Sequence, residues 1–532
     1  MFKKIGKILF ARYLLIFLFI FSFFFISNST DAAITIQRTG SKTYRNIQSA
    51  LNAAAPGDII FLGRGTYAGS GNGNNINWPD INNLTLRGIS ANETVISAEA
   101  LGRAIKVGNA VSLTIEALTI KDGKVSSNGA GIYLADNSKL CLKNVVLRNC
   151  SAIGHSILAG TGGAIRSSGS SIHAVNCTFT KNYAGFSGGV AYGGTWEARS
   201  CAFIGNWAAS SSGVAYNGRW KASGCVFHSN SSLNAAGVSE ADEWEAVNCI
   251  FTSNSAPYGG VAWGGTWNVY NCNFYDNFSP QGGIAYVANW SAVNSIFWGS
   301  NNPFEGGRGE LKYCDVQGGF RILGLKECIS ANPMFRDAPR GDFHLTVDSP
   351  CIDTGTSEGA PENDIEGRSR PYPSNSKGLL YDMGAYEFQR PAYDIFVSPY
   401  GSDRNTGRNN SPLRTIQRAL SLVSEGRTIF LKKGRYQGPI NNWPKYIQDI
   451  TIKSMSATRE DTVVSWSGTG GVFDLSSVPN DIRGTIESIT ITAGITADAG
   501  SVVLLPANSN IKIENCFIEG IRPTEESGND GL

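Results

Sequence analysis

Residues 189–206 read GVAYGGTWEARSCAFIGN, and this stretch decides the fold because it returns four times along the chain. The later copies are GVAYNGRWKASGCVFHSN at 213–230, GVSEADEWEAVNCIFTSN at 237–254, GVAWGGTWNVYNCNFYDN at 260–277 and GIAYVANWSAVNSIFWGS at 283–300. Their Trp residues lie 24, 24, 23 and 23 positions apart, and a Phe column keeps the same step. A fixed period of this length is typical of a solenoid, in which each repeat packs only on its neighbours.

Alternation within one repeat separates the residues that face the core from those that face solvent. Trp196 points one way, Ser200 interrupts the alternation, and Phe203 resumes it. Asn or small residues at the interruption suit a bend with left-handed backbone. A further short strand at 190–192 precedes a Gly-rich turn, so each coil holds three short parallel strands. We therefore predict an all-β chain that folds as a right-handed parallel β-helix.

The Trp and Cys columns are predicted to lie in the core. Small residues such as Ala191 leave room inside a coil for Trp196, whereas the opposite phase would bury Glu197 and Arg199. The cysteines that repeat with the coil favour stacked, buried thiols, and disulfides between neighbours are the alternative. This column consists of Cys177, Cys201, Cys225, Cys249 and Cys272.

The chain is predicted to hold two solenoids in tandem, the second incomplete. An amphipathic helix within 43–55, with the strand after it, caps the first coil, and ten residues between Ile47 and Tyr67 recur at a constant offset of 369. We predict a first β-helix with its cap over 34–300, an Asp-, Gly- and Pro-rich closing cap over 301–390, and a second β-helix over 391–532. Because the second solenoid has few coils and no comparable cap, we expect a missing segment or a partner at its open C-terminal end.

Residues 1–33 have the pattern of an export signal. Basic residues precede an apolar stretch of 14 residues at 13–26, shorter than the roughly 20 that a membrane-spanning helix needs, and small residues follow up to Ala33. This predicts a signal peptide, a secreted or cell-surface location, and a mature chain that is not transmembrane. The 45 Lys and Arg against 43 Asp and Glu argue against nucleic acid as a partner.

Several motifs resemble those of known bacterial proteins. GGAI at 162–165 and the tetrapeptides FTKN, FIGN, FHSN, FTSN and FYDN resemble the repeats of polymorphic outer membrane proteins and related β-helix repeat proteins. TIQRAL at 415–420 resembles the opening of pectin-lyase-like proteins, and DSPCID to DMGAYEF at 348–388 is similar to the region that closes many large secreted β-helix proteins. The resemblance implies a pectin-lyase-like fold and an exported or surface location. It implies no single function, because this fold hosts lyases, hydrolases, epimerases, adhesins and phage tailspikes.

One outward row of residues is the best candidate binding surface. Aromatic faces at coil spacing can stack on sugar rings, while Arg166 and Glu240 orient hydroxyl groups, which predicts a glycan ligand. The alternative is ordinary aromatic stacking that stiffens an exposed sheet. By the alternation, the row consists of Tyr133, Arg166, Tyr192, Tyr216, Glu240, Trp263 and Tyr286.

No residues stand out as a catalytic set, and no motif requires a cofactor. Glu240, Asp242 and Glu243 form the best acidic cluster, and their oxygens can bind a hard cation such as Ca²⁺. The alternative is a solvated turn, because neighbouring coils have no acid at equivalent points. Four acids of the closing region are expected to fix loops, with a structural calcium site as the alternative: Asp353, Asp364, Asp382 and Glu387.

The function expected from these patterns is non-catalytic binding of a polysaccharide or cell-surface glycan, as in an adhesin. A polysaccharide lyase acting on a uronate polymer such as pectate is the alternative that the resemblance implies. A structural surface spacer is the third hypothesis.

Overall fold

The structure is a computed structural model that describes residues 33–40, 42–156, 158–240, 243–318, 324–372, 381–441, 443–444, 447–466, 471–475, 482–493, 502–506 and 509–520. Two compact units share them: the first holds the described residues up to 371 together with 381–387, and the second holds 372 and those from 388 onward. The predicted signal peptide lies outside the described residues except for Ala33. No helix among the described residues is long and apolar enough to span a bilayer.

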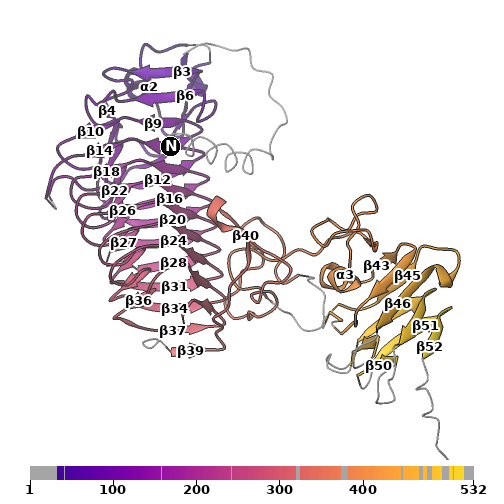
Figure 1. Cartoon of the computed structure of the whole chain (residues 1–532). Coiled ribbons are helices and arrows are strands. Elements are labelled where there is room, and N and C mark those ends of the chain that lie inside the picture. The colour runs from indigo at the N-terminus through magenta and orange to yellow at the C-terminus, as the bar shows by residue number, and fades with distance from the viewer. Residues whose placement is uncertain are drawn as a thin grey trace, which may run out of the picture. The chain divides into compact units, whose positions relative to one another are not determined.

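The first unit is a stack of coils whose strands line up in long parallel sheets (Figure 1). One sheet begins with the only antiparallel pair in its described ladder, β1 with β2, and continues in parallel. Its strands are β1 (Ile34–Ile36), β2 (Ile59–Leu62), β5 (Leu84–Arg87), β8 (Ser112–Glu116), β12 (Lys139–Lys143), β16 (Ser171–Val175), β20 (Thr195–Arg199), β24 (Arg219–Ser223), β28 (Glu243–Val247), β31 (Thr266–Tyr270), β34 (Asn289–Val293), β37 (Arg308–Lys312) and β39 (Gly324–Lys326). We call it the long-strand sheet.

Two further sheets complete the predicted three-strand coil. The sheet that holds the outward row, here the row sheet, consists of β4 (Ile76–Asn77), β7 (Ile105–Val107), β11 (Ile132–Leu134), β15 (Ile165–Arg166), β19 (Ala191–Tyr192), β23 (Ala215–Tyr216), β27 (Ser239–Glu240), β30 (Ala262–Trp263), β33 (Ala285–Tyr286) and β36 (Phe304–Glu305). The third sheet consists of β3 (Gly65–Ala68), β6 (Thr94–Ser97), β9 (Thr119–Lys121), β13 (Val146–Arg148), β17 (Thr178–Thr180), β21 (Ala202–Ile204), β25 (Val226–His228), β29 (Ile250–Thr252), β32 (Asn273–Tyr275), β35 (Ile296–Trp298) and β38 (Asp315–Val316).

Some coils contain a fourth strand that the alternation did not predict. A short sheet lies between the third sheet and the row sheet in chain order and consists of β10 (Lys124–Val125), β14 (Ser151–Ala152), β18 (Tyr183–Ala184), β22 (Trp207–Ala208) and β26 (Ser231–Ser232). Each strand has only two residues, too few for a period of two to be recognised in the sequence.

The aromatic columns fill the core, as predicted. Trp196 stacks on Trp220 with ring centroids 4.6 Å apart, and Phe203 stacks on Phe227 at 4.7 Å. Rings of the two columns meet edge to face, for example Phe203 with Trp220 at 5.8 Å. The stacked cysteines are buried and unbridged, so the stacked-thiol prediction is confirmed. The predicted bends have left-handed backbone, with φ of 51° at both Ser200 and Asn248.

A buried asparagine ladder runs beside the Phe column, and the sequence pattern alone does not reveal its role. At each step the side-chain Nδ2 donates to the Oδ1 of the next coil and to a backbone carbonyl of the preceding one, so Asn206 donates to Asn230 (2.9 Å) and to the Phe179 carbonyl (2.9 Å). Burial of polar amides is tolerated here because each finds partners in the adjacent coils. The ladder consists of Asn182, Asn206, Asn230, Asn254 and Asn277.

The start of each solenoid is covered by a short helix, as the sequence duplication predicts. In the first unit α2 (Ile47–Ala53) follows η1 (Gln37–Thr39), and the Asn46 side chain caps the helix by accepting from the Ser49 backbone N–H at 2.8 Å. In the second unit α3 (Ile416–Leu422) is capped in the same way by Thr415. Both helices bury one apolar face against the first strands.

The coils continue past the predicted boundary at residue 300, because β36 to β39 pair in register with the earlier strands. The segment that follows contains β40 (Phe335–Asp337), η2 (Ala338–Arg340) and β41 (Asp342–Leu345), and it packs on the side of the solenoid. Phe343 meets Tyr275 of the third sheet with ring centroids 5.4 Å apart. The segment with β40 and β41 therefore covers an outer face of the coils, whereas we predicted a closing cap at the end of the stack.

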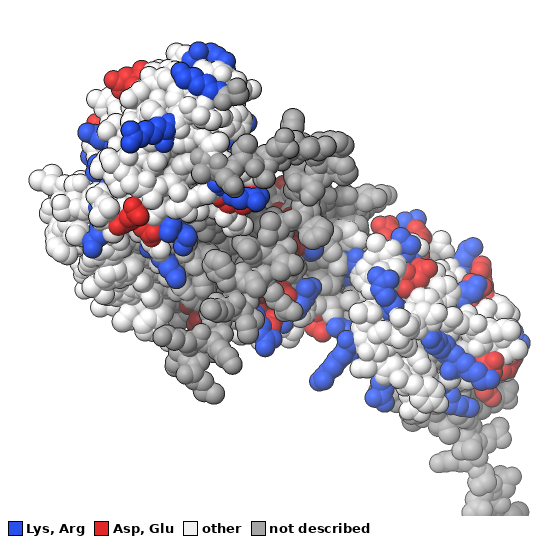
Figure 2. Space-filling view, turned by 90° about the horizontal axis from the view of Figure 1, so that it is seen from above, with Lys and Arg blue, Asp and Glu red and all other residues white. Residues whose placement is uncertain are grey.

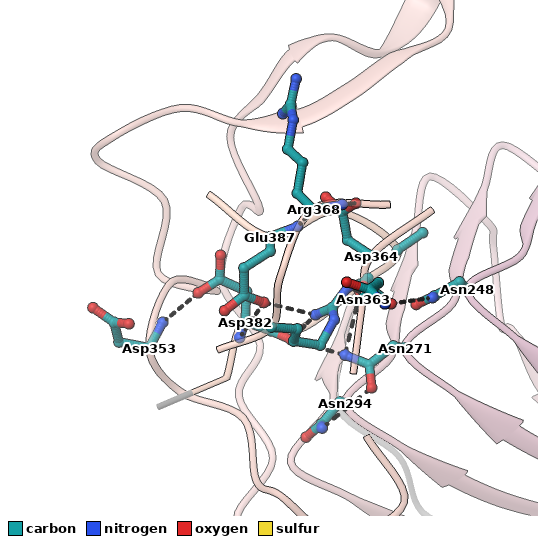
Figure 3. A network of polar contacts seen from close by, with 12 residues as sticks. Asn248, Asn271, Asn294, Asp353, Asn363, Asp364, Arg368, Asp382 and Glu387 are labelled. Carbon is teal, nitrogen blue, oxygen red and sulfur yellow. Dashed lines mark hydrogen bonds and ion pairs between the residues drawn. The ribbon is translucent and has the colours of Figure 1, made fainter. Parts of the chain in front are cut away.

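Asparagines at the bends hold this segment in place (Figure 3). The Asn248 side chain donates to the Asn363 carbonyl at 2.7 Å, Asn271 donates to the Asp382 carbonyl at 3.0 Å, and Asn294 donates to the Thr356 carbonyl at 2.7 Å. The bend asparagines thus provide the left-handed backbone and also an outward amide that binds a second layer of chain.

The second unit repeats the architecture on a smaller scale around its own apolar core. Tyr67 and Tyr436, which match at the offset of 369, each donate from the phenol to a backbone carbonyl four residues earlier, at 3.2 Å and 2.6 Å. Its elements are β42 (Ile395–Val397), β43 (Thr428–Leu431), β45 (Ile450–Ser454), β48 (Arg483–Glu487) and β51 (Asn510–Glu514); β44 (Gly434–Gln437), β46 (Thr462–Trp466), β49 (Thr490–Ala493) and β52 (Phe517–Gly520); β47 (Phe473–Asp474) and β50 (Val503–Leu504); and η3 (Arg459–Asp461).

Candidate functional site

The predicted outward row exists as one continuous column on the row sheet. Parallel pairing places Tyr133 beside Arg166, Arg166 beside Tyr192, and so on through Tyr216, Glu240 and Trp263 to Tyr286. All seven side chains are half-buried. The pairing also extends the row to Asn77 and Lys106 at one end and to Glu305 at the other.

Tyr133 is covered by two guanidinium groups. The Cζ of Arg103 lies 5.0 Å from its ring centroid, and the Cζ of Arg166 lies 5.1 Å from it. The two arginines come from the coils before and after Tyr133, and such cation–π contacts occupy the ring. The Tyr133 ring is therefore covered by neighbouring side chains, and Arg103 in turn donates to the Gly129 and Asn128 carbonyls, each at 2.8 Å.

Tyr192 and Tyr216 stack on each other in the middle of the row. Their ring centroids lie 5.6 Å apart and their planes are inclined by 21°. This geometry matches the alternative of stacking along the sheet, because one face of each ring is covered by its neighbour. The edges and phenol groups of the two rings lie outside this stacking contact.

Trp263 and Tyr286 have a third aromatic partner, Tyr258, which lies outside the predicted row. Tyr258 lies 6.0 Å from Trp263 and 5.4 Å from Tyr286, measured between ring centroids. Tyr258 pairs with Gln281 of the next coil, in the turn that precedes the row strand. The sequence does mark Tyr258 as unusual. The equivalent positions of neighbouring coils hold small or polar residues such as Ser187 and Ser211, so an aromatic residue stands out there.

Glu240 occupies the row between Tyr216 and Trp263. Burial raises the pKa of its carboxyl group above the usual value, although a hydrogen bond from Ser211 acts in the opposite direction. Its Oε2 atom is buried and has no hydrogen-bond partner among the described residues. A buried carboxyl oxygen that accepts no hydrogen bond is energetically unfavourable, so a donor at this position would be stabilising.

The two described members of the predicted acidic cluster lie on different sheets. Glu243 forms an ion pair with Arg219 of the preceding coil, with Nε and Oε2 3.0 Å apart, while Glu240 lies in the row. Asp242 lies outside the described residues. No group of three His, Cys, Asp or Glu side chains that could hold a metal occurs in the described part of the chain. A calcium site at this cluster therefore stays a prediction.

Three of the four acids of the closing segment, Asp364, Asp382 and Glu387, fix loops, as expected for them. Both Asp364 oxygens accept backbone N–H groups, Oδ1 from Arg368 at 2.9 Å and Oδ2 from Glu387 at 3.1 Å. Asp382 accepts from the backbone N–H of Asp353 at 2.8 Å (Figure 3). Glu387 pairs with the buried guanidinium of Arg370 at 2.8 Å. These oxygens are occupied by donors from the protein itself.

An open groove of about 650 Å³ runs beside the row, over the turns that lead into the long-strand sheet. Its floor is formed by tight turns, in which Gly194 and Asn217 have φ of 85° and 58°. A Cβ at Gly194 would lie 2.7 Å from the Ser167 carbonyl oxygen, so the turn needs glycine. The other groove residues are Asn137, Ser138, Lys139, Gly169, Ser170, Ser171, Thr195, Gly218, Arg219 and Glu243.

The charges on the face shown in Figure 2 lie in small groups, with acidic side chains beside basic ones and uncharged surface between them. The formal net charge of the chain is only +2 at pH 7. Contacts with a ligand would therefore depend on particular residues, because no broad field of one sign covers the face shown.

Comparisons with known proteins support the same architecture. A sequence family described as a right handed beta helix region matches residues 103–278, and a protein of unknown function (DUF1565) family matches residues 400–458. The coil geometry and the first match together show that this chain has a right-handed parallel β-helix fold.

Two curated relatives match parts of the chain. Uncharacterized protein YwoF of Bacillus subtilis (strain 168) is 25% identical over 161 residues, which cover 28% of this chain and 34% of that protein. Pectate lyase PEL9 of Emericella nidulans is 35% identical over 100 residues, which cover 18% of this chain and 23% of the lyase. The chain thus spans about a third or less of the length of these relatives.

Solved structures of polysaccharide lyases also align with the chain. Pectate lyase Pel9A aligns over 66% of this chain and 93% of its own, with 14% identity and a TM-score of 0.36. The PL6 family alginate lyase AlyGC aligns over 88% and 76%, with 12% identity and a TM-score of 0.27.

Proposed function

We propose that this chain binds a polysaccharide or a cell-surface glycan, without catalysis, through the outward row and the groove beside it. The observation that supports this proposal is the unbroken series of half-exposed aromatic, basic and acidic side chains on successive coils. Sugar polymers present apolar C–H faces and many hydroxyl groups, which such a mixed strip can contact repeatedly along its length.

The binding mode follows from how the rings lie. Tyr192 and Tyr216 present edges and phenol groups, which suit hydrogen bonds to hydroxyl groups. The polar groove next to them, which Lys139 and Ser171 help to line, offers further donors. No cofactor is required for such binding. We further propose that it takes place outside the cell, because residues 1–33 have the pattern of an export signal.

The test is retention of the exported protein in affinity gels that contain one polysaccharide each. The double variant Tyr192→Ser/Tyr216→Ser should lose retention on the gels that retard the wild-type protein. The matched control is Tyr183→Ser/Trp207→Ser, which removes a stacked pair of half-buried rings, 4.7 Å apart, from the neighbouring short sheet. Equal retention of the wild-type protein and the row variant would refute the proposal.

A second candidate function is a polysaccharide lyase acting on a uronate polymer, and the 35% identity to a pectate lyase over 100 residues favours it. Pectate, alginate and glycosaminoglycans would be offered with and without Ca²⁺ while the absorbance of unsaturated uronate is followed. A calcium-dependent rise would establish the lyase, and a flat trace on every polymer would exclude it. If no polysaccharide gel retards the protein and no polymer gives a rise in absorbance, a structural spacer is the remaining function.

A further inference from the structure

The outward row changes the sign of its charge along the solenoid. At its N-terminal end Lys106 lies beside Tyr133, whose ring is covered by Arg103 and Arg166. In its C-terminal half the charged members are carboxylates, Glu240 and Glu305. The two ends of one binding strip therefore suit ligand groups of opposite charge.

Aromatic rings surround the acidic position. The pairing register places Tyr216 on the strand before Glu240 and Trp263 on the strand after it. Tyr258 adds a ring against Trp263 with centroids 6.0 Å apart, and Tyr286 closes the group at 5.4 Å from Tyr258. Ring faces attract cations, and a carboxylate among rings strengthens that attraction.

Basic groups of the same coils are engaged elsewhere. Arg219 pairs with Glu243 at 3.0 Å, and Lys221 pairs with Glu245 at 3.2 Å. Glu240 forms no ion pair with any basic residue in the described part of the chain, and its Oε2 lacks a donor. Burial raises the pKa of this carboxyl group, as expected for an acid without a cationic partner.

We infer that the C-terminal half of the row binds the protonated amine of an amino sugar, with Glu240 accepting a hydrogen bond from the ammonium group. This inference rests on the proposed glycan-binding function and specifies the sugar class for this half. A primary ammonium fits better than a quaternary one because only the primary group offers N–H donors to the carboxyl group. An amino sugar also offers ring C–H groups to Trp263 and Tyr258.

The experiment compares binding of glucosamine oligosaccharides with their N-acetylated counterparts of equal length, by calorimetry on the full chain. Acetylation removes the charge and keeps the sugar. The wild-type protein should bind the free amine at least about tenfold more tightly, as expected for one charge-assisted hydrogen bond. Glu240→Gln should bring the ratio to about one. The control Glu245→Gln removes a carboxylate from the same coil on the long-strand sheet and should keep the preference.

Three results would overturn the inference: a ratio of one in the wild-type protein, a preserved ratio in Glu240→Gln, or the same loss in Glu245→Gln. Competition supplies a test on the unmodified protein, in which methylammonium should displace the oligosaccharide and tetramethylammonium should not. Equal competition would show that the site does not require an N–H donor and would overturn the amino-sugar assignment. If the affinity gels still separate the Tyr192→Ser/Tyr216→Ser variant from the wild-type protein, the glycan-binding proposal stands without this inference. If they do not, both the glycan-binding proposal and the amino-sugar inference are refuted.

Discussion

Replacing Asn230 by Ala removes the central step of the buried asparagine ladder. Its Oδ1 accepts from the Asn206 backbone N–H at 3.0 Å and from the Asn206 side chain at 2.9 Å. Its Nδ2 donates to the Phe203 carbonyl at 2.9 Å and to Asn254 Oδ1 at 3.0 Å. Four hydrogen bonds are lost at about 1 kcal/mol each, so the free energy of unfolding should fall by about 4 kcal/mol.

The assay is urea unfolding followed by the fluorescence of the core tryptophans, with hydrogen exchange to locate the change. Because neighbouring coils stabilise each other, we expect faster exchange mainly in the coils that contain Asn206 and Asn254. The control Asn268→Ala removes an exposed asparagine from β31 and should change stability by less than about 0.5 kcal/mol.

A second variant separates the amide's donors from its acceptor. Asn230→Asp keeps an oxygen for Asn206 and removes the donors to Phe203 and Asn254, so it should be destabilised at neutral pH and partly recovered when the carboxyl group is protonated. The ladder argument is refuted if Asn230→Ala is within about 1 kcal/mol of the wild-type protein, or if Asn268→Ala costs as much.

Three further predictions concern the rest of the first unit. Burial raises the pKa of Asp315 to about 6, so its neutral form is favoured in the folded state, and this carboxyl group should cost the wild-type protein about 2 kcal/mol of stability as the pH rises from about 4 to 6. The Asp315→Asn variant should lose less stability over the same pH range. If the urea midpoints of the variant and the wild-type protein change with pH by the same amount, this prediction is wrong. Asn271→Gly keeps the left-handed backbone but removes the hydrogen bond to the Asp382 carbonyl. Residues 381–387 should therefore exchange amide hydrogens faster or be cleaved faster by a protease. The control Asn268→Ala should leave both rates unchanged. Trp244→Leu should cost about 2–4 kcal/mol in urea unfolding because it opens a cavity and removes the indole hydrogen bond to the Ser239 hydroxyl, and a smaller loss would show that the coil collapses around it.

The candidate row shows where sequence reasoning succeeds and where it stops. Alternation and period placed Tyr192, Tyr216 and Trp263 in one outward column, because in-register parallel strands convert a sequence period directly into a spatial one. The same rules say nothing about ring orientation. The stacking of Tyr192 on Tyr216, and the engagement of Tyr133 by two arginines, depend on side-chain rotamers and on neighbouring turns.

The sequence by itself determined the solenoid, its inward columns, its left-handed bends and the duplicated start, because each depends on contacts between residues one coil apart. Only the tertiary structure decided where the chain after residue 329 goes. Asn271 reaches Asp382 across 111 residues, a contact that no local period encodes. It also decided that Glu240 lies half-buried among rings without a donor for Oε2, since burial depends on side chains that meet only when the coils stack.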